Sequence, residues 1–221
     1  QSEHARQKSM GLALDSRDMP LLSVIIRSMD RATLSDALDS VALQTYPNIE
    51  VVVVNAKGTD HRDIGAWCGR FPMHRVGEGE PLTRSQAANM GLGAAKGEYL
   101  IFLDDDDWFL PHHILTLKAE LDRHDTAIAV YSAVQAINEQ CEEIRRFEED
   151  FDSVQFHIDN FIPIHAVLFR RRVIDSGACF DEALGVCEDW DFWLQILQYG
   201  EFRFVAKVGA IYQMYNSMRS G

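Results

Sequence analysis

The chain has 221 residues, 47% of them hydrophobic and 25% charged, which is enough for one sizeable core or at most two small domains. Its formal net charge is −13. Because a nucleic-acid-binding protein normally carries a basic face, this charge disfavours that class, and we expect no nucleic-acid partner.

The first half of the chain alternates predicted strands and helices. Residues 1–19 are polar, and we interpret them as an N-terminal extension ahead of the fold. Thr33 and Asp36 resemble a capping box at the start of a first helix, and a second helix is expected over about 83–95. Short apolar runs predict buried strands at 21–26, 49–54 and 100–103. This order favours an α/β layered domain with a largely parallel sheet.

The second half of the chain is less regular. Phe192, Ile196 and Tyr199 fall on one face of a helix predicted over 188–199. The run 139–152 is highly charged, which predicts an exposed loop or hairpin. Strands are expected at 127–137 and 164–169, followed by two short closing strands at 202–206 and 210–215.

Four consecutive carboxylates, Asp104 to Asp107, follow the predicted strand 100–103 directly. Adjacent acids repel one another, and a fold tolerates them where a cation or a metal-bound phosphate lies. In open α/β sheets the ligand crevice lies at the carboxyl ends of the strands. The alternative is an acidic loop that only begins a helix at Pro111, where the helix dipole favours acids.

A second acidic motif, Glu188 to Trp193, opens the last predicted helix. The simpler interpretation is that its acids compensate the helix dipole above an aromatic core contact. Together with the first cluster, the motif allows a division in which one acidic group holds a metal and the other acts as a base.

Six stretches of the chain, in this order, resemble the family 2 glycosyltransferases of GT-A fold. They are LSVII (22–26), SVALQTYPNIEVVVV (40–54), AANMG (87–91), GEYLIFLDDDD (97–107) with Pro111, FDE (180–182) and EDWDFW (188–193). The resemblance implies a single Rossmann-like α/β domain with a mixed, mostly parallel sheet flanked by helices. It further implies a nucleotide-sugar-binding half, 20–110, and an acceptor-binding half with the catalytic base, 111–221.

The resemblance also assigns roles to the two acidic motifs. Asp104 and Asp106 fall on the family's DXD positions, which hold a nucleotide-sugar diphosphate through Mn²⁺ or Mg²⁺, and Asp105 would lie beside that donor. Carboxylate oxygens suit such hard cations. Asp189 falls on the position of the base that deprotonates the acceptor hydroxyl in an inverting displacement.

Residues near the predicted base would face the acceptor. Glu188, Asp191 and Trp193 are assigned to that side by the resemblance. His165 lies where the acceptor site would open, although a hydrogen-bonded structural role is the stronger interpretation of a lone histidine.

The sequence departs from the family at the predicted nucleoside pocket. Asn55 and Ala56 stand where the family usually has acids; Asn55 can still accept the imide N–H of uracil, which keeps a UDP-sugar favoured. Arg27 could reach a phosphate or remain a solvated arginine. Asp30 and Arg31 are expected to frame the pocket, and Arg84, before the 87–91 stretch, to contact ribose or phosphate. The residues predicted to bind the nucleotide-sugar donor are therefore Arg27, Asp30, Asn55, Arg84, Asp104 and Asp105.

Three functions are therefore weighed. The leading one is a metal-dependent inverting sugar transferase acting on a carbohydrate, lipid-linked or protein acceptor. A nucleotidyltransferase-like enzyme is disfavoured because a glycine-rich basic phosphate loop is missing near the first strand. A non-catalytic nucleotide-sugar-binding module of a larger protein is kept open by Asn55 and Ala56.

Location and chain context are predicted from absent signals. No apolar run has the length of a membrane helix, and no signal peptide is visible. Four cysteines without CxxC spacing are interpreted as free thiols of a reducing compartment, so a cytoplasmic protein is expected. The chain starts at Gln1 without Met, which suits a piece of a longer polypeptide.

Overall fold

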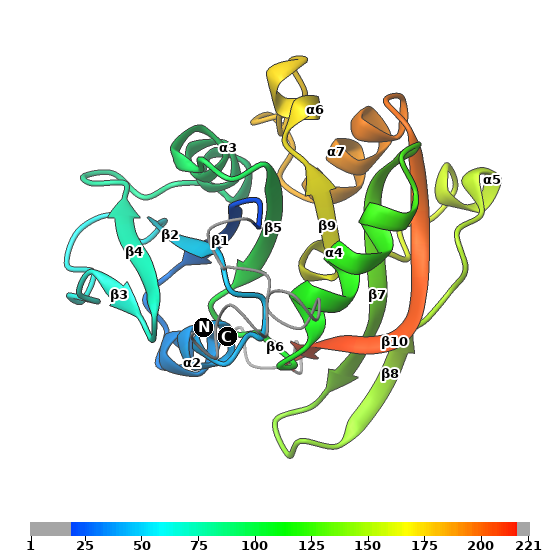
Figure 1. Ribbon diagram of the computed structural model, residues 1–221. Helices are drawn as coiled ribbons and strands as arrows, with labels where there is room; N and C mark the ends of the chain where they lie inside the picture. Colours follow the sequence, from blue (N-terminus) through cyan, green and yellow to red (C-terminus); the bar gives the residue numbers. More distant parts are fainter. Residues whose placement is uncertain (1–18, 216–221) are drawn as a thin grey trace, which may run out of the picture.

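A ten-stranded mixed sheet with helices on both sides runs through residues 19–215, the part of the chain that the computed structural model describes (Figure 1). The strand order is β3-β4-β2-β1-β5-β9-β7-β10-β6, and β8 pairs with β7. The strands are β1 (Leu22–Ser28), β2 (Ile49–Asn55), β3 (Trp67–Cys68), β4 (Phe71–Val76), β5 (Tyr99–Asp104), β6 (Trp108–Phe109), β7 (Ala127–Ile137), β8 (Glu143–Phe147), β9 (Val167–Arg170) and β10 (Glu201–Gln213).

The first half of the sheet is parallel: β1 lies between β2 and β5, and β4 continues from β2. Every residue of β1 and β2 is buried, as in a sheet covered on both faces. Helices α2 (Leu34–Ala42) and α3 (Arg84–Ala94) provide this cover from opposite sides (Figure 1). Gly91 of α3 lies so close to Ile25 that a side chain there would clash, so α3 packs tightly and fixes the position of its first residue, Arg84.

The second half of the sheet is mixed. Strand β9 is antiparallel to both β5 and β7, whereas β10 runs parallel to β7 and its far end pairs antiparallel with β6. Phe169 of β9 packs on α7 (Glu188–Leu197), and the next residue, Arg170, donates to the carbonyl oxygen of Leu121 in α4 (His113–Arg123). Because successive strand residues point to opposite faces, α4 and α7 cover opposite faces of the second half. The short helices are α5 (Ser153–Phe156), η2 (Ile164–Ala166) and α6 (Arg172–Asp175).

An aromatic cluster fixes α7 against the sheet. Phe192 stacks on Phe180 with ring centroids 4.3 Å apart, and Phe169 meets both Phe192 and Trp193 edge-on at 5.6 and 5.8 Å. Phe102 of β5 completes the cluster. Each such pair adds about 0.5–1.5 kcal/mol to the gain from burial, so the start of α7 is held rigidly against β5 and β9.

The α/β fold predicted from the sequence is confirmed, and so are the strands of the first half, β7, the charged hairpin that contains β8, and the three longest predicted helices. Four details were wrong. Thr33 has helical dihedrals, and within the described residues its hydroxyl makes no cap bond; a capping box forms instead at Thr83 and Gln86. Strands β3 and β4 were missed. Residues 164–166 form a 3₁₀ turn ahead of β9, and one bent strand, β10 (Glu201–Gln213), replaces the two strands predicted over 202–206 and 210–215.

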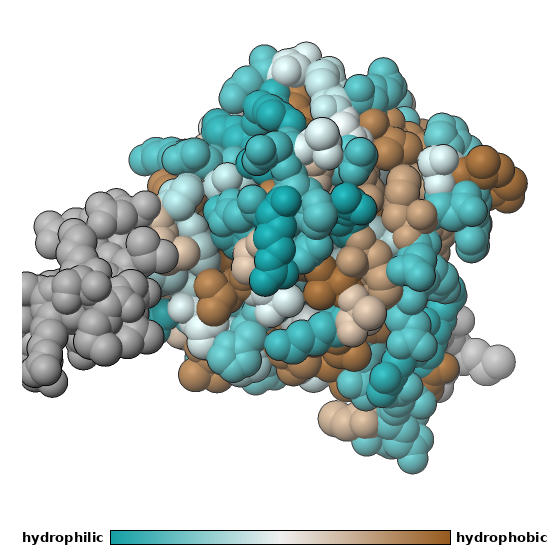
Figure 2. Space-filling view, turned by 45° about the vertical axis from the view of Figure 1, so that its right-hand side comes forward, coloured by the Kyte–Doolittle hydropathy of each residue, from teal (hydrophilic) through white to brown (hydrophobic). Residues whose placement is uncertain are grey.

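Several large hydrophobic side chains are exposed, among them Leu43, Trp67 and Ile158. Figure 2 shows a face on which hydrophilic residues predominate and hydrophobic residues form small separate groups. Within residues 19–215, no helix is long and apolar enough to cross a membrane. All four cysteines are free thiols, as the sequence predicted. The predicted N-terminal extension lies outside the described residues except for Met19.

Candidate functional site

Two adjoining cavities lie at the carboxyl ends of β1, β2 and β5. The first, the strand-end pocket, has a volume of about 340 Å³ and extends from Met29 and Ala56 to Tyr215. The second, the helix-start pocket, has a volume of about 240 Å³ and lies between Ile162 and Asp189. Both are lined by Arg27, Arg84, Asp104, Asp107 and Tyr212, so they form one continuous cleft.

Arg27 stands at the junction of the two pockets. Its Nε and Nη2 donate to the two carboxylate oxygens of Asp104 at 2.7 and 2.8 Å, and its Nη1 lies 3.4 Å from Oε1 of Glu188. Burial disfavours its charge, but Asp104 and Glu188 raise its pKa, so Arg27 stays cationic. Burial likewise acts to raise the pKa of Asp104, yet the guanidinium lowers it below the ordinary value. Arg27 is therefore a fixed, buried ion-pair partner rather than a solvated arginine.

Of the four consecutive aspartates, Asp105 alone lines neither pocket. Asp104 and Asp106 line the strand-end pocket, whereas Asp105 is fully buried beneath the loop after β1. There its carboxylate accepts hydrogen bonds from the amide of Met29 at 2.7 Å, the hydroxyl of Ser28 at 3.1 Å and the amide and guanidinium of Arg31. Asp105 thus holds the loop that borders the pocket, and the structure gives it no exposed surface toward a ligand.

Asp107 is held from the far end of the chain. Its Oδ1 accepts from the amide of Gln213 at 2.8 Å, and its Oδ2 lies 3.2 Å from Nδ1 of His165. Burial, together with the charges of Asp104 and Asp106, raises the pKa of Asp107 well above its usual range. Burial lowers the pKa of His165 to about 4, so the imidazole is neutral. The His165 ring lines the helix-start pocket, and its Nε2 has no partner within the described part of the chain.

The pair Asp104 and Asp106 was predicted to hold a divalent cation. Burial raises the pKa of Asp106, and Asp104 and Asp105 raise it further against the opposing charge of Arg31, whose Nη1 lies 3.6 Å away. The pocket thus offers carboxylate oxygens, the ligands that Mg²⁺ and Mn²⁺ favour, beside the three arginines Arg27, Arg31 and Arg84. Each oxygen of Asp104 retains a lone pair beside its bond to Arg27. The residues fit a cation that a bound phosphate would help to ligate, although within 19–215 no group of three ligating side chains is preassembled.

Asp189 lies in the first turn of α7 and faces the helix-start pocket. Its Oδ1 accepts from Nδ2 of Asn160 at 3.3 Å and from the amide of Trp190 at 2.8 Å. Burial and the neighbouring charge of Glu188 raise its pKa, and the bonds from Trp190 and Asn160 oppose that shift only in part. Desolvation therefore outweighs the helix dipole, which by itself favours the ionised form of an acid in a first helical turn.

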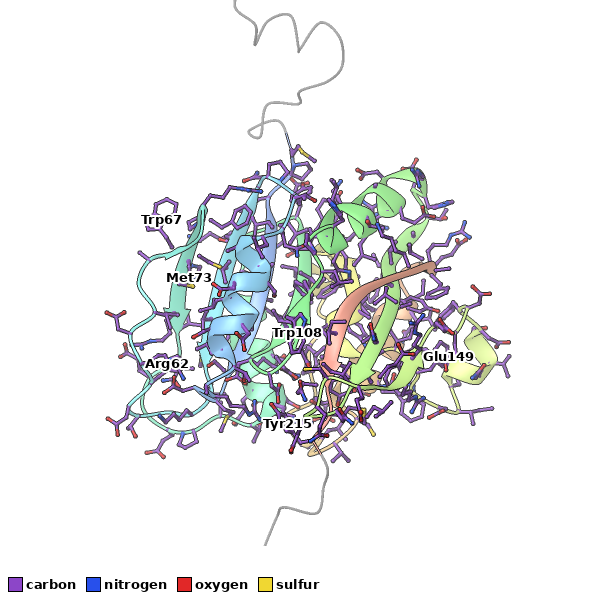
Figure 3. All side chains as sticks on the ribbon, turned by 90° about the horizontal axis from the view of Figure 1, so that it is seen from below. Arg62, Trp67, Met73, Trp108, Glu149 and Tyr215 are labelled. Carbon is purple, nitrogen blue, oxygen red and sulfur yellow. The ribbon has the colours of Figure 1, made fainter. Side chains whose placement is uncertain are left out.

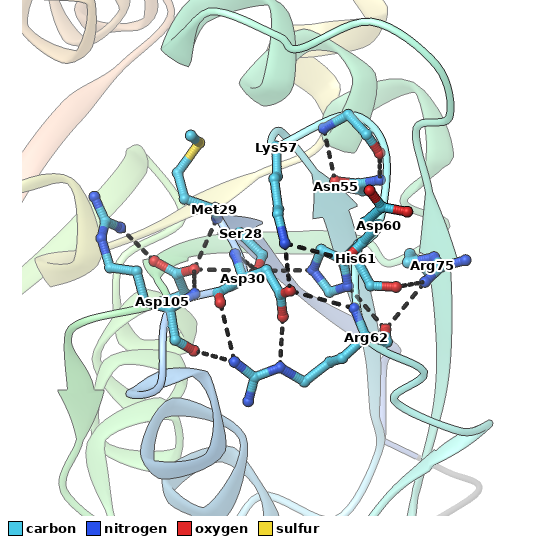
Figure 4. A network of polar contacts seen from close by, with 12 residues as sticks. Ser28, Met29, Asp30, Asn55, Lys57, Asp60, His61, Arg62, Arg75 and Asp105 are labelled. Carbon is cyan, nitrogen blue, oxygen red and sulfur yellow. Dashed lines mark hydrogen bonds and ion pairs between the residues drawn. The ribbon is translucent and has the colours of Figure 1, made fainter.

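Two non-glycine residues beside the cleft have left-handed backbone. Cys187, directly before α7, has a φ of 58°, and Asp30, after β1, has a φ of 60°. Such a conformation costs on the order of 1–3 kcal/mol and persists only where the surroundings impose it. Around Asp30 the cause is visible in Figure 4: Lys57 donates to its carboxylate at 3.0 Å, and Arg62 donates to both its carboxylate and its carbonyl oxygen.

Asn55 and Asp30 lie at the end of the sheet, as expected, but their polar groups are turned away from the strand-end pocket. The amide nitrogen of Asn55 donates to the carbonyl of Gly58, and its Oδ1 accepts from the amide of Gly58 at 3.0 Å. Burial acts to raise the pKa of Asp30, but hydrogen bonds from Lys57 and Arg62 lower it to about 2. Both side chains stabilise the loops after β1 and β2.

The residues assigned to the acceptor side separate into different environments. Glu188 is buried and lines the helix-start pocket beside Arg27. Asp191 accepts from Gln195 of its own helix at 2.7 Å and lines neither pocket. Trp193 is fully buried in the aromatic cluster, so its assignment to the acceptor side is corrected to a core role. The helical spacing of Trp193 with Ile196 and Leu197 was the signal for that role.

Several residues of the cleft were not anticipated. Tyr212 and Gln213 enter because β10 bends back to pair with β6, and Tyr215 follows at the edge where the two halves of the molecule meet (Figure 3). Asn160, the partner of Asp189, comes from the segment between α5 and η2. No local sequence signal identifies these residues, since their positions depend on pairings between distant segments.

Comparisons with known proteins agree with this geometry. A sequence profile described as "Glycosyl transferase family 2" matches residues 23–177. An uncharacterized glycosyltransferase of Rickettsia felis is 28% identical over 205 residues, which are 84% of this chain and 33% of that protein. The crystal structure of S. aureus TarS 1-349 with UDP-GlcNAc superposes with a TM-score of 0.69 at 19% identity, over 91% of this chain and 61% of that one. A mannosyltransferase of Pyrobaculum calidifontis, in complex with GDP-Man and Mn²⁺, gives a TM-score of 0.64 at 18% identity, over 94% and 60%. The chain thus spans a third to three fifths of the length of these proteins.

Proposed function

The chain belongs to glycosyl transferase family 2, and we propose that it moves a sugar from a nucleotide-diphosphate-sugar to an acceptor hydroxyl with inversion at the anomeric carbon. The observation that carries this proposal is the continuous cleft in which Asp104 lines both pockets, Asp106 lines the strand-end pocket and Asp189 lines the helix-start pocket. The structural neighbours whose complexes contain UDP-GlcNAc or GDP-Man support a nucleotide-sugar as donor.

The diphosphate would lie at the shared wall of the two pockets. Arg27 and Arg84 line both pockets there and supply positive charge. We propose that Asp106, with the free lone pairs of Asp104, holds Mn²⁺ or Mg²⁺; when bound, that cation would offset the charge of the departing diphosphate. The Mn²⁺ in the mannosyltransferase complex supports this assignment.

The acceptor would enter through the helix-start pocket. Its hydroxyl oxygen attacks the anomeric carbon, the bond from that carbon to the diphosphate oxygen breaks with its electron pair, and the hydroxyl proton passes to the carboxylate of Asp189. A base whose pKa has moved up toward neutral pH accepts a proton more readily, provided that it is ionised when the acceptor binds. The raised pKa of Asp189 is consistent with this role.

The remaining expectations belong to the same proposal. A carbohydrate, lipid-linked or protein acceptor and a division of labour near residue 110 are proposed from the family. A cytoplasmic location is proposed from the cysteine usage and the absence of targeting signals in the sequence. His165 and Glu188 line the helix-start pocket and are proposed to border the acceptor.

A direct experiment measures nucleoside diphosphate release from UDP-GlcNAc and GDP-Man, with Mn²⁺ and with a chelator. We expect release and binding in Mn²⁺, a large loss in chelator, and the same loss in Asp106→Asn. Asp191→Asn is the matched control, because its carboxylate lies outside both pockets. Equal donor affinity in chelator and in Mn²⁺ would remove the cation from the proposal. Tight donor binding without release or transfer would instead favour a binding module.

A further inference from the structure

The strand-end pocket has two chemically different ends. Arg27, Arg84, Asp104 and Asp106 make one end charged. The other end, between the loops after β1 and β2 and the start of α3, is lined by the apolar side chains of Met29, Ala56, Leu82 and Ala87. A diphosphate needs the charged end, which leaves the apolar end for the flat face of a nucleobase.

Much of the backbone that borders the apolar end is already hydrogen-bonded within the protein. Six amide N–H groups in this region already donate to acceptors within the protein, at distances of 2.7–3.3 Å. They belong to Met29, Asp30, Arg31, Ala56, Gly58 and Leu82. A carbonyl oxygen or ring nitrogen of a base therefore finds none of these amides free.

The polar side chains nearby are engaged as well. Asn55 uses both its amide oxygen and its amide nitrogen on Gly58, and Asp30 is bound by Lys57 and Arg62. Asp105 is buried beneath the loop (Figure 4). At the position of Ala56, a methyl group lines the pocket in place of an acceptor. At Ala56 the edge of a base thus meets a methyl group where a selective site would place a hydrogen-bond partner.

We propose that the donor pocket accepts nucleoside diphosphates with different bases at similar affinity. This inference rests on the proposed function. A pocket built to hydrogen-bond a substrate rejects analogues by about 10⁴–10⁵-fold, whereas an apolar pocket separates them by only about 10–200-fold. Arg31, whose side chain is 44% exposed and borders the pocket, can stack on any base, since every base has a π-face.

The first test is calorimetric titration of the protein with UDP, GDP, ADP and CDP in the presence of Mn²⁺. We expect four dissociation constants within about tenfold of one another, as apolar contact and stacking predict. If one nucleotide binds at least a hundredfold more tightly than the others, the base is read and this inference fails while the proposed function stands. If none of the four binds, the proposed function fails and this inference fails with it.

The second test introduces the missing acceptor. Ala56→Asp adds a carboxylate to the apolar end, so it should separate the four dissociation constants by a further tenfold or more. Ala56→Leu is the matched control, because it adds bulk without an acceptor and should weaken all four nucleotides together. Thermal unfolding of each variant checks that it is folded. If Ala56→Leu separates the bases as strongly as Ala56→Asp, selection by shape already operates in this pocket and the inference is overturned.

Discussion

Asp104 at the end of β5 and Asp189 at the start of α7 both line the cleft, but their surroundings move their pKa values in opposite directions. At the end of β5, Asp104 is bound on both oxygens by the guanidinium of Arg27, which lowers its pKa. At the start of α7, burial and the charge of Glu188 raise the pKa of Asp189, and the hydrogen bonds from Trp190 and Asn160 and the more distant charge of Arg27 offset this only in part. Two carboxylates whose pKa values are moved apart suit two roles, one as a permanent ion and one as a proton acceptor.

The comparison is tested most severely at Asp189. Asp189→Asn preserves an acceptor for the amide of Trp190 but cannot take a proton, so sugar transfer should fall by roughly 10²–10⁴-fold. Transfer is measured with the cognate acceptor, and donor binding is measured separately by calorimetry. Donor binding should persist. Turnover at the wild-type rate would remove Asp189 from the mechanism and leave Glu188 as the next candidate.

At the other end of the comparison, removal of Arg27 should cost stability rather than chemistry alone. Arg27→Met leaves Asp104 and Glu188 without their cation in a buried setting, which should lower the free energy of unfolding by about 3–5 kcal/mol. The loss in the free energy of unfolding is measured by urea denaturation followed by circular dichroism. The control is Arg123→Met, whose exposed pair with Glu120 should contribute less than about 1 kcal/mol. A loss no larger than that of the control would mean that the buried ion pairs are not needed.

The pH dependence of transfer should follow Asp189 and not Asp104. Because the base must be ionised, the rate should fall about tenfold per pH unit below the pKa of Asp189. This acidic limb of the pH–rate profile should lie above the ordinary carboxyl pKa of 3.8. A limb at or below 3.8, or one that survives in Asp189→Asn, would contradict this assignment.

Asp104 and Asp189 should contribute to the free energy of unfolding with opposite dependence on pH. The stabilisation that ionised Asp104 contributes is present above pH 3.8 and is lost as the pH falls through its lowered pKa. The native state holds the Asp189 proton more tightly than the unfolded chain does. The stabilisation from protonated Asp189 is therefore lost as the pH rises through its raised pKa.

The smallest expected effect concerns the neutral partner of Asp189. Asn160→Ala removes one hydrogen bond to the ionised carboxylate, worth about 0.5–1.5 kcal/mol, so the pKa of Asp189 should rise by no more than about one unit. The acidic limb of the rate profile would move to higher pH by that amount. Gln195→Ala removes the partner of Asp191 instead and should leave the limb in place. A limb that does not move in Asn160→Ala would show that this contact is not formed during the reaction.

The sequence predicted the first half of the fold well because its signals are local. Strands β1, β2 and β5 are continuous apolar runs buried on both faces, and the acids come directly after β5. Local signals in the sequence could not tell which of the four aspartates line the cleft. That choice depends on distant partners: Arg27 and Glu188 are 161 positions apart, and Asp107 and Gln213 are 106 apart. In the same way, β10 continues through its bulges because β7 pairs along its whole length and β6 pairs with its far part, which no local pattern of 202–215 encodes.

The bond from Gln213 to Asp107 also bears on when the site can exist during synthesis. The acidic turn leaves the ribosome 106 residues before the amide that holds its last carboxyl group. At a synthesis rate of about 5–20 residues per second, that interval is roughly 5–20 s. Until the last strand is made and docks, β7 presents an unpaired edge and the turn lacks the neighbour that completes the wall of the cleft. A nascent chain that stops short of β10 should therefore be unable to sequester nucleotide-sugars, and the cleft should close around its ligand only once the last strand is in place.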